Sequence, residues 1–431
     1  MADTTRRAFS TSAVHAGQGP DSSTLSRAVP IYRTSSFVFK SAEHAANLFA
    51  LKEPGNIYSR LGNPTNDILE ARVTELEGGL ASVAVASGTS AVFYAVINIA
   101  RAGDEIVSAS NLYGGTYTMF DAILPDLGIH TRFVDSRDPV NFERAISPKT
   151  RLLYLETIGN PALDVADVEA VSRIAKRHSL PLVVDATFTT PYLLRTIELG
   201  ADVVINSLTK WLGGHGTAIG GIVTDAGRFD WSDPKFDLYV RPDKNYHGLR
   251  WALDLPQGQR AVAFALRFRT VPLRNLGACL SPDNAWLFLQ GIETLHVRMQ
   301  RHCENALAVA RHLEHHPKVS WVRYPGLEND PSHEVATRLF SKGFGGMVVF
   351  GIRGGREAGG RFIETLKLFS HVANVGDAKS LAIHPATTTH SQLSEEQLRE
   401  AGVGVDLVRL SIGIEDVTDI IADIDQALAA I

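Results

Sequence analysis

The chain has 431 residues, more than one hydrophobic core usually serves, so we expect a large domain with a smaller second one. Apolar residues make up 45% of the sequence and charged residues 21%, as in an ordinary globular enzyme. The formal net charge of -5 argues against a surface that binds nucleic acid or an anionic membrane.

The cysteines and the first residues of the chain bear on its location. Cys279 and Cys303 form neither a CxxC pair nor a disulfide framework, which favours a reducing compartment. The first residues lack the apolar segment of a secretory signal, and no run approaches the roughly 18 apolar residues of a membrane-spanning helix. We therefore expect a cytoplasmic protein that makes no contact with a membrane.

The first 280 residues divide into an arm and a sheet-forming region. Residues 1–60 are rich in Ser, Thr, Gly and Pro and show little periodicity, so we expect an extended arm. Short apolar runs then alternate with helix-like stretches such as GTSAVFYAVINIA, a pattern typical of a parallel sheet covered on both faces. The runs are SVAVA, EIVSA, RLLYLE, PLVVDA, DVVINS and GGIVT. The sequence predicts a doubly wound α/β domain over residues 61–280.

The rest of the chain has a different pattern. Residues 225–280 are rich in aromatic residues and are too long for a tight connection, which is typical of a functional or interface segment. Long helical patterns and then strand patterns follow, so we expect a smaller α+β domain over residues 281–431. His312 and His315 are three apart on a helical stretch but lack neighbouring acidic or cysteine ligands, so we expect no metal site.

Polar residues follow four of the apolar runs. They are Ser87, Gly88 and Thr89; the segment 157–160, which ends in Asn160; Asp185; and Ser207, Thr209 and Lys210. Ligands of an open parallel sheet bind at the carboxyl ends of its strands, so these groups are expected to meet in one place.

The chemistry of these groups is complementary. A Ser-Gly-Thr helix start offers free N–H groups to a phosphate, and a lysine can hold an aldehyde as a Schiff base. A buried aspartate can keep a pyridine nitrogen protonated. The combination indicates pyridoxal phosphate. Each residue also has a simpler explanation when it is taken singly. Ser87 could be only a helix cap, and Asp185 could be only the partner of a structural ion pair. Two residues discussed below have similar alternatives: Tyr113 could be a core aromatic residue, and Arg409 could pair with a surface acid.

These motifs resemble those of the Cys/Met-metabolism enzymes, which use pyridoxal phosphate and have the aspartate-aminotransferase-like fold (fold type I). The resemblance covers essentially the whole chain and rests on SGTSA, SLTKW, IYSRLGNPT, NLYGGTY, ETIGNP, VVDATF and LVRLSIGIED. It implies that Lys210 binds the cofactor covalently and that Ser87, Gly88, Thr89, Ser207 and Thr209 hold the phosphate.

The same resemblance implies roles for the remaining residues. Tyr58 and Arg60 would reach the phosphate of a neighbouring subunit, and Tyr113 would stack on the pyridine ring. Asn160 would meet the phenolic oxygen of the cofactor, Asp185 its ring nitrogen, and Thr187 would support the ring. Arg409 would bind the substrate carboxylate, with Ser380 beside it and with Asn160 and Tyr58 also near the substrate. Tyr58 and Tyr113 are further candidates for proton transfer.

Within this family, the segment 225–280 and the run HVANVGDAKSLAIHPATTTH resemble the O-acetylhomoserine sulfhydrylase branch. The implied reaction replaces the acetyl ester of O-acetylhomoserine with sulfide to give homocysteine, in a homotetramer built from two dimers. A methionine γ-lyase is less favoured, because that branch usually has cysteine where this chain has Gly115. The sequence also leaves open an enzyme that acts on O-succinylhomoserine, such as a cystathionine γ-synthase, and a non-catalytic protein of the same fold.

Overall fold

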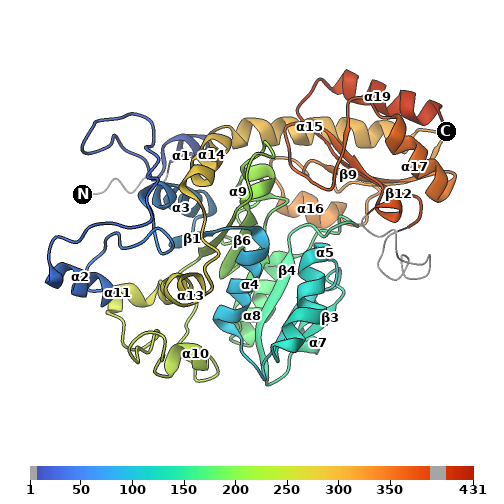
Figure 1. Ribbon diagram of the computed structural model, residues 1–431. Helices are drawn as coiled ribbons and strands as arrows, with labels where there is room; N and C mark the ends of the chain where they lie inside the picture. Colours follow the sequence, from blue (N-terminus) through green and yellow to red (C-terminus); the bar gives the residue numbers. More distant parts are fainter. Residues whose placement is uncertain (1–6, 389–403) are drawn as a thin grey trace.

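The computed structural model describes residues 7–388 and 404–431. The end of the run HVANVGDAKSLAIHPATTTH therefore lies outside the described residues. A large seven-stranded sheet and a smaller five-stranded sheet are connected by a long helix (Figure 1). The arm lies on one side of the large sheet and the small sheet lies at the other end of the long helix. The predicted α/β fold is confirmed.

The large sheet has the strand order β1-β7-β6-β5-β4-β2-β3. Its strands are β1 (Ala81–Val85), β2 (Glu105–Ala109), β3 (His130–Val134), β4 (Thr150–Glu156), β5 (Leu182–Asp185), β6 (Val203–Ser207) and β7 (Gly221–Asp225). The pairs from β6 to β3 are parallel, whereas β7 is antiparallel to both β6 and β1. All six predicted runs are strands, and β7, which follows β6 after η2 and a glycine-rich segment, runs antiparallel to β6.

Helices cover the large sheet and position its polar strand ends. They are α3 (Pro64–Glu77), α4 (Gly88–Ile99), α5 (Gly114–Thr118), η1 (Met119–Ile123), α6 (Leu124–Asp126), α7 (Val140–Ala145), α8 (Val168–Arg177), α9 (Thr190–Leu193) and the helical turn η2 (Leu208–Leu212). Helix α4 packs against β6 and β7, and its apolar residues Val92, Val96 and Ile99 are buried in the large core. This packing fixes the start of α4 beside the end of β6.

The N-terminal arm is partly helical, which corrects the expectation of an extended segment. Helices α1 (Phe9–His15) and α2 (Ala42–Phe49) interrupt it, and α1 buries Ser12 and Ala13 against α3. These helices have only seven and eight residues, too few to show a clear period in the sequence. Leu25 and Val38, in the rest of the arm, are 77% and 96% exposed.

The aromatic segment 225–280 packs closely against the large domain. The rings of Trp231 and Tyr239 are stacked with their centroids 4.5 Å apart, and Asn98 of α4 donates a hydrogen bond to the Tyr239 hydroxyl at 3.0 Å. The segment contains α10 (Asp237–Val240), α11 (Gln257–Arg260), α12 (Ala263–Phe268), η3 (Arg269–Leu273) and α13 (Arg274–Leu276). Its buried rings stabilise the face of the sheet that α4 covers.

The small sheet has the order β10-β11-β12-β9-β8. The C-terminal elements are α14 (Pro282–Glu293), α15 (Leu295–Glu314), β8 (Val319–Arg323), α16 (His333–Leu339), β9 (Met347–Ile352), α17 (Gly355–Thr365), β10 (Ser370–His371), β11 (Leu381–Ile383), η4 (Pro385–Thr387), β12 (Leu407–Ser411) and α19 (Val417–Ala429). Leu295 and Met299 of α15 belong to the large core, whereas Ala306 and Leu313 belong to the second core. The two cores therefore meet within α15. No helix of the described residues is long and apolar enough to cross a membrane.

Candidate active site

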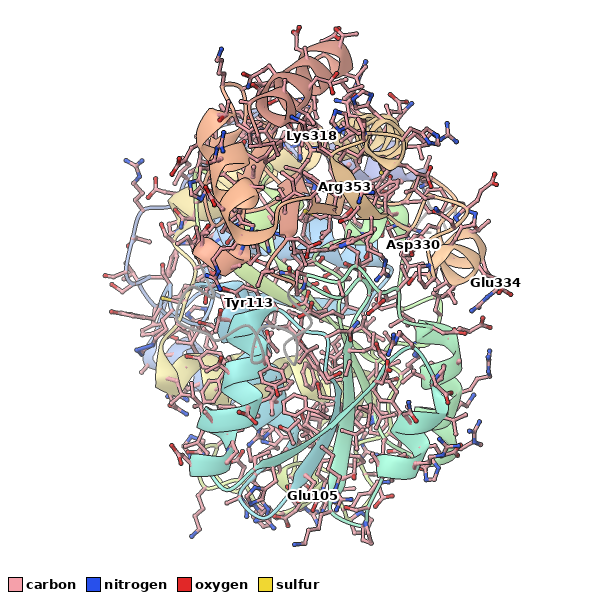
Figure 2. The ribbon with its side chains drawn as sticks, turned by 90° about the vertical axis from the view of Figure 1, so that its right-hand side faces the viewer. Glu105, Tyr113, Lys318, Asp330, Glu334 and Arg353 are labelled. Carbon is pink, nitrogen blue, oxygen red and sulfur yellow. The ribbon has the colours of Figure 1, made fainter. Side chains whose placement is uncertain are left out.

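The carboxyl ends of β4, β5 and β6 carry the polar groups that the sequence placed there. These strands are parallel neighbours, with Glu156 of β4 in register with Asp185 of β5. Figure 2 shows Tyr113 where the large sheet meets the small domain, whereas Glu105, at the start of β2, lies at the opposite end. The candidate site therefore lies between the two domains.

The start of α4 has the features of a phosphate-binding site. The Ser87 hydroxyl caps the helix by accepting the N–H of Ser90 at 3.0 Å, and the first turn contains no acidic residue. A Cβ atom on Gly88 would lie only 2.7 Å from the Cβ of Ser207, so only glycine permits this approach between α4 and β6. Thr89 follows in the same turn. The helix end is thus held against β6 with free N–H groups and hydroxyls around it.

Asp185 is held in a polar chain that leads to β6. The N–H of Thr187 donates to Asp185 Oδ1 at 2.9 Å, and the Thr187 hydroxyl accepts the N–H of Ser207 at 2.8 Å. Burial raises the pKa of Asp185 to about 6, although its hydrogen bonds with Thr187 act in the opposite direction. Among the described residues, Asp185 makes no ion pair. Its carboxylate therefore lacks the cationic partner that a protonated pyridine ring would supply.

Lys210 lies in η2, directly after β6, and its Nζ donates a hydrogen bond to Asn374 Oδ1 at 2.6 Å. Burial, followed by the positive charge of Arg409, lowers the pKa of Lys210 to about 8. A substantial fraction of the amine is thus neutral near physiological pH, the form that reacts with an aldehyde.

Asn374 is a site residue that the sequence reasoning did not identify. It follows β10 and reaches Lys210 because the turn after it packs on the backbone of Trp211. Gly376 has φ +79°, and a Cβ atom there would lie 2.7 Å from the Trp211 nitrogen. Trp211 itself is fully buried and packs edge-on against Phe188. The tryptophan and the glycine together hold Asn374 at the lysine.

The lowered pKa of Lys210 predicts how the apoprotein reacts with pyridoxal phosphate. The rate of imine formation is expected to rise about tenfold per pH unit below pH 8 and to level off above it, because only the neutral amine reacts. Stopped-flow absorbance across this pH range measures the rate. A rate that kept rising towards pH 10.5, the ordinary pKa of a lysine, would contradict the prediction.

Arg409 of β12 reaches the large domain from the small sheet. Its Nη1 donates to Asn160 Oδ1 at 2.9 Å, and burial lowers its pKa to about 10. Ser380, expected beside it, is fully buried; its hydroxyl donates to Glu415 Oε2 at 3.0 Å and accepts the N–H of Gly413 at 2.9 Å. Arg409 and Asn160 are thus brought together, whereas Ser380 supports the backbone that follows β12.

Tyr113 is half-exposed at the start of α5, and its backbone N–H donates to Glu156 Oε1 at 2.7 Å. Its ring lies directly over Gly115, where a Cβ atom would be 2.6 Å from the ring atom Cε1. Any side chain at position 115 must therefore displace the ring.

The variant Gly115→Ala is expected to lower kcat/KM roughly tenfold, because a displaced ring no longer lies in the reactive geometry. Gly114→Ala is the matched control, since a Cβ atom there meets nothing within 4 Å. Neither glycine has a positive φ, so neither variant should lose thermal stability. Steady-state kinetics and melting curves measure both effects, and equal kinetics for the two variants would contradict the prediction.

Tyr58 and Arg60 lie in the arm. Tyr58 is 42% exposed, and the Arg60 guanidinium lies 5.2 Å from the centroid of its ring. The Nε atom of Arg60 is buried and makes no hydrogen bond with residues 7–388 or 404–431. The two residues contact each other within the arm, and Arg60 also lies near Gly277. These contacts do not bring Tyr58 or Arg60 to Lys210 of the same chain.

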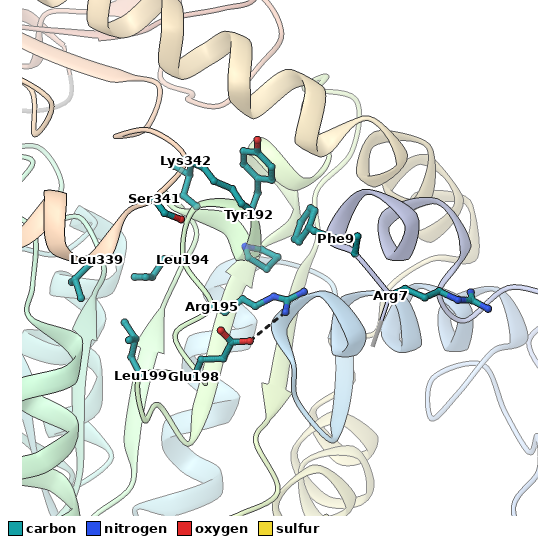
Figure 3. A pocket seen from close by; sticks show the side chains of 13 residues that line it. Arg7, Phe9, Tyr192, Leu194, Arg195, Glu198, Leu199, Leu339, Ser341 and Lys342 are labelled. Carbon is teal, nitrogen blue, oxygen red and sulfur yellow. Dashed lines mark hydrogen bonds and ion pairs between the residues drawn. The ribbon is translucent and has the colours of Figure 1, made fainter. Parts of the chain in front are cut away.

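A cavity of about 390 Å³ lies elsewhere, between α1, α9 and the segment 339–342 (Figure 3). Lys342 lies over the Tyr192 ring at 4.7 Å there, and Arg195 pairs with Glu198 at 3.2 Å. None of its lining residues is a predicted site residue. The converging strand ends, rather than this cavity, have the chemistry of an active site.

The residues at the strand ends fit pyridoxal phosphate. The glycine-lined start of α4 suits the phosphate, the buried Asp185 suits a protonated ring nitrogen, and the partly neutral Lys210 suits the aldehyde. Thr209 lies beside them, with its hydroxyl accepting the N–H of Gly220 at 3.1 Å.

Comparison with known proteins agrees with this chemistry. The sequence profile of the family described as "Cys/Met metabolism PLP-dependent enzyme" matches residues 10–429. The chain is 53% identical to the O-acetyl-L-homoserine sulfhydrylase of Leptospira meyeri, with 97% of this chain and 96% of the relative covered. It is 49% identical to the homocysteine synthase of Schizosaccharomyces pombe, with 97% and 98% covered.

A similar solved structure is that of a Campylobacter jejuni protein crystallised with N'-pyridoxyl-lysine-5'-monophosphate. Its TM-score is 0.93 at 41% identity, with 98% of this chain and 100% of that chain covered. The fold, the lysine-centred site and these relatives agree over the whole length. The chain belongs to the Cys/Met-metabolism family of pyridoxal-phosphate-dependent enzymes.

Proposed function

We propose that this enzyme converts O-acetyl-L-homoserine and sulfide into L-homocysteine and acetate. The observation that carries the proposal is full-length identity of about one half to relatives named O-acetyl-L-homoserine sulfhydrylase and homocysteine synthase. The reaction breaks the bond between the γ-carbon and the ester oxygen and forms a bond between that carbon and sulfur. Sulfide enters as HS⁻ and keeps its proton in the thiol group of homocysteine, and the acetate ion carries the negative charge away.

The large domain would hold the cofactor. Ser87, Gly88, Thr89, Ser207 and Thr209 would bind its phosphate, and Asp185 its ring nitrogen. Thr187, which contacts Asp185, would support the ring nearby, and Tyr113 would stack on it. When bound, the cofactor delocalises the negative charge that develops at the α- and β-carbons of the substrate.

Lys210 would carry protons to and from these carbons. Its lowered pKa lets the amine exchange a proton near neutral pH. When the amine is not covalently attached to the cofactor, its hydrogen bond to Asn374 gives it a fixed position. Tyr58 and Tyr113 are proposed as secondary groups in proton transfer. Lys210 is the principal one, because it combines partial neutrality with a defined hydrogen bond.

Arg409 would bind the substrate carboxylate with two parallel N–H groups, with Asn160 holding the guanidinium in place. Burial of Arg409 strengthens such a bond, because little water competes for the guanidinium.

The variant Arg409→Lys should raise KM for O-acetylhomoserine about ten- to a hundredfold, since lysine cannot make the bidentate pair. Arg353→Lys is the control, because Arg353 is exposed in the small domain and its side chain donates to the backbone carbonyl of Pro317, before β8. Steady-state kinetics with varied O-acetylhomoserine gives both constants. An unchanged KM in Arg409→Lys would rule out Arg409 as the carboxylate ligand.

We also propose a homotetramer of two dimers in the cytoplasm. The exposed apolar residues of the arm, such as Val38, and the unpartnered Arg60 Nε support an arm that is completed by a second chain. Tyr58 and Arg60 would then reach the neighbouring cofactor, next to the substrate. The two free cysteines support a reducing compartment. Mixing inactive Arg60→Ala and Lys210→Ala chains should restore partial activity, because one of the two mixed sites keeps both residues.

The decisive experiment is a substrate panel. Purified enzyme with pyridoxal phosphate should form homocysteine from O-acetylhomoserine and sulfide faster than from O-succinylhomoserine, and should cleave methionine and cystathionine slowly. Consumption of O-acetylhomoserine no faster than in buffer would overturn the proposal. Faster turnover of methionine would assign the enzyme to the γ-lyases instead, and Gly115→Cys would then be the variant to compare.

A further inference from the structure

Glu156 is a buried carboxyl group at the centre of the site for which the proposed reaction has no use. It ends β4, and its side chain points to the same face of the sheet as that of Asp185, its register neighbour on β5. Glu156 is buried, with only 8% of its surface exposed, and Asp185 is partly buried beside it. Two carboxylates side by side in a buried place are costly unless one of them is protonated.

Glu156 also holds Tyr113. The backbone N–H of Tyr113 donates to Glu156 Oε1 at 2.7 Å, and this contact joins the start of α5 to the end of β4. Glu156 thus lies between the residue that stacks on the cofactor and the residue that meets its ring nitrogen. A shift of the Glu156 side chain would move Tyr113 and change the electrostatic environment of Asp185.

The surroundings decide which of the two groups carries the proton. Thr187 donates hydrogen bonds that favour the charged form of Asp185. Burial, followed by the charge of Asp185, raises the pKa of Glu156 well above its usual range. Tyr154, two residues earlier on the same face of β4, is fully buried and stays neutral, and no described cation pairs with Glu156. Such a division of two neighbouring carboxyl groups separates their roles.

We propose that Glu156 is a positioning residue that keeps its proton in the working enzyme: its neutral carboxyl group holds the backbone of Tyr113 and leaves the negative charge of the pair on Asp185. The inference rests on the proposed cofactor site. It assigns to Glu156 a role in placing the stacked tyrosine and in keeping Asp185 charged.

Two variants test this. Glu156→Gln keeps the shape of a neutral carboxyl group and an oxygen that accepts the N–H of Tyr113, whereas Glu156→Ala removes that acceptor. Glu156→Gln is expected to bind pyridoxal phosphate within about twofold of the unchanged protein, and Glu156→Ala about tenfold more weakly. Equilibrium dialysis of the apoproteins with pyridoxal phosphate measures both. The pH titration of the visible absorption of the bound cofactor should match the unchanged protein in Glu156→Gln and shift in Glu156→Ala.

A second readout needs no cofactor. The infrared spectrum of the unchanged apoprotein at pH 7 should contain a C=O band of a protonated carboxyl group that is missing from Glu156→Gln. Glu77, whose pKa burial raises to about 8, is present in both proteins and cancels in the difference. A missing difference band, or weaker cofactor binding in Glu156→Gln than in Glu156→Ala, would overturn the proposal, as would unchanged binding in both variants. If only the proposed function were wrong, the result would differ: cofactor binding would be normal and the infrared band would be present, but O-acetylhomoserine would not be turned over.

Discussion

Replacing Lys210 with alanine is expected to lower kcat on the order of 10⁴-fold or more, because the variant loses both the covalent attachment of the cofactor and the principal proton carrier. Asn374 then has no amine to accept from, and no other lysine takes part in the described contacts of the site. The measurement is turnover of O-acetylhomoserine together with borohydride reduction followed by peptide mapping. The reduced pyridoxyl group should be found on Lys210 in the unchanged enzyme and nowhere in the variant.

The matched control is Lys379→Ala. Lys379 follows the same turn that carries Asn374, but its side chain is 74% exposed and lies 3.9 Å from Asp377. This variant should keep its activity and its cofactor. Residual activity of a tenth or more in Lys210→Ala would mean that another group carries the protons, and the roles given to Tyr58 and Tyr113 would have to be reconsidered.

The strands of the large sheet could be predicted because each is a short, continuous apolar run buried on both faces. Strand β3 was missed for the opposite reason: its sequence, HTRFV, has only two apolar residues, and at the edge of the sheet its residues are partly buried or exposed. The apolar pattern of β7 does not reveal that it runs antiparallel to β6. Length and polarity therefore identify strands well, whereas their order and direction depend on the connections.

The same limit applies to the site. Asp185, Ser207 and Lys210 could be found because they directly follow apolar runs, so that one rule about strand ends places all three. Asn374 could not, because it reaches Lys210 through a turn whose position depends on Gly376 packing against Trp211, more than 160 residues earlier in the chain. Glu156 was visible at the end of RLLYLE, but its importance depends on a register with β5 that the sequence does not specify. The sequence pattern does not predict contacts between segments that are far apart in the chain.

The charged groups of the site come from both domains. Arg409 stands on the small sheet, and its charge reaches Lys210 of the large domain and lowers the pKa of the lysine. Asp185 and Glu156 lie on the large sheet, and Arg409 donates its hydrogen bond to Asn160 instead. The placement of the small domain through α15 therefore contributes, after burial, to the lowered pKa of Lys210, and it also fixes the position of Arg409.

The second large effect is expected for Asp185→Asn, which should lower kcat about 10²- to 10⁴-fold, because a neutral amide no longer keeps the ring nitrogen of the cofactor protonated. Cofactor binding should also weaken, while the hydrogen bond from Thr187 to the side-chain oxygen can persist. Asp225→Asn is the matched control. Asp225 is also a buried carboxyl group, and burial raises its pKa to about 7. It ends the antiparallel strand β7 beside Val203, the first residue of β6, and so lies at the opposite end of the strands from Asp185; it accepts the N–H groups of Gly227 and Ala265.

The two aspartates can be told apart by the pH dependence of stability. The pKa of Asp185 in the folded apoprotein is about 6, above its ordinary value of 3.8, so ionisation favours the unfolded state. As the pH rises from about 4 to 6, the unchanged apoprotein should therefore lose stability relative to Asp185→Asn, and above pH 6 the difference should stay constant. Melting curves of the apoproteins measure this difference, and kinetics of the holoenzymes measures the loss of activity. Asp225→Asn should show a similar stability trend, shifted towards pH 7, but nearly normal kcat. If Asp185→Asn kept its kcat, Asp185 would be a structural carboxyl group like Asp225, and the role of ring-nitrogen partner would fall to another residue.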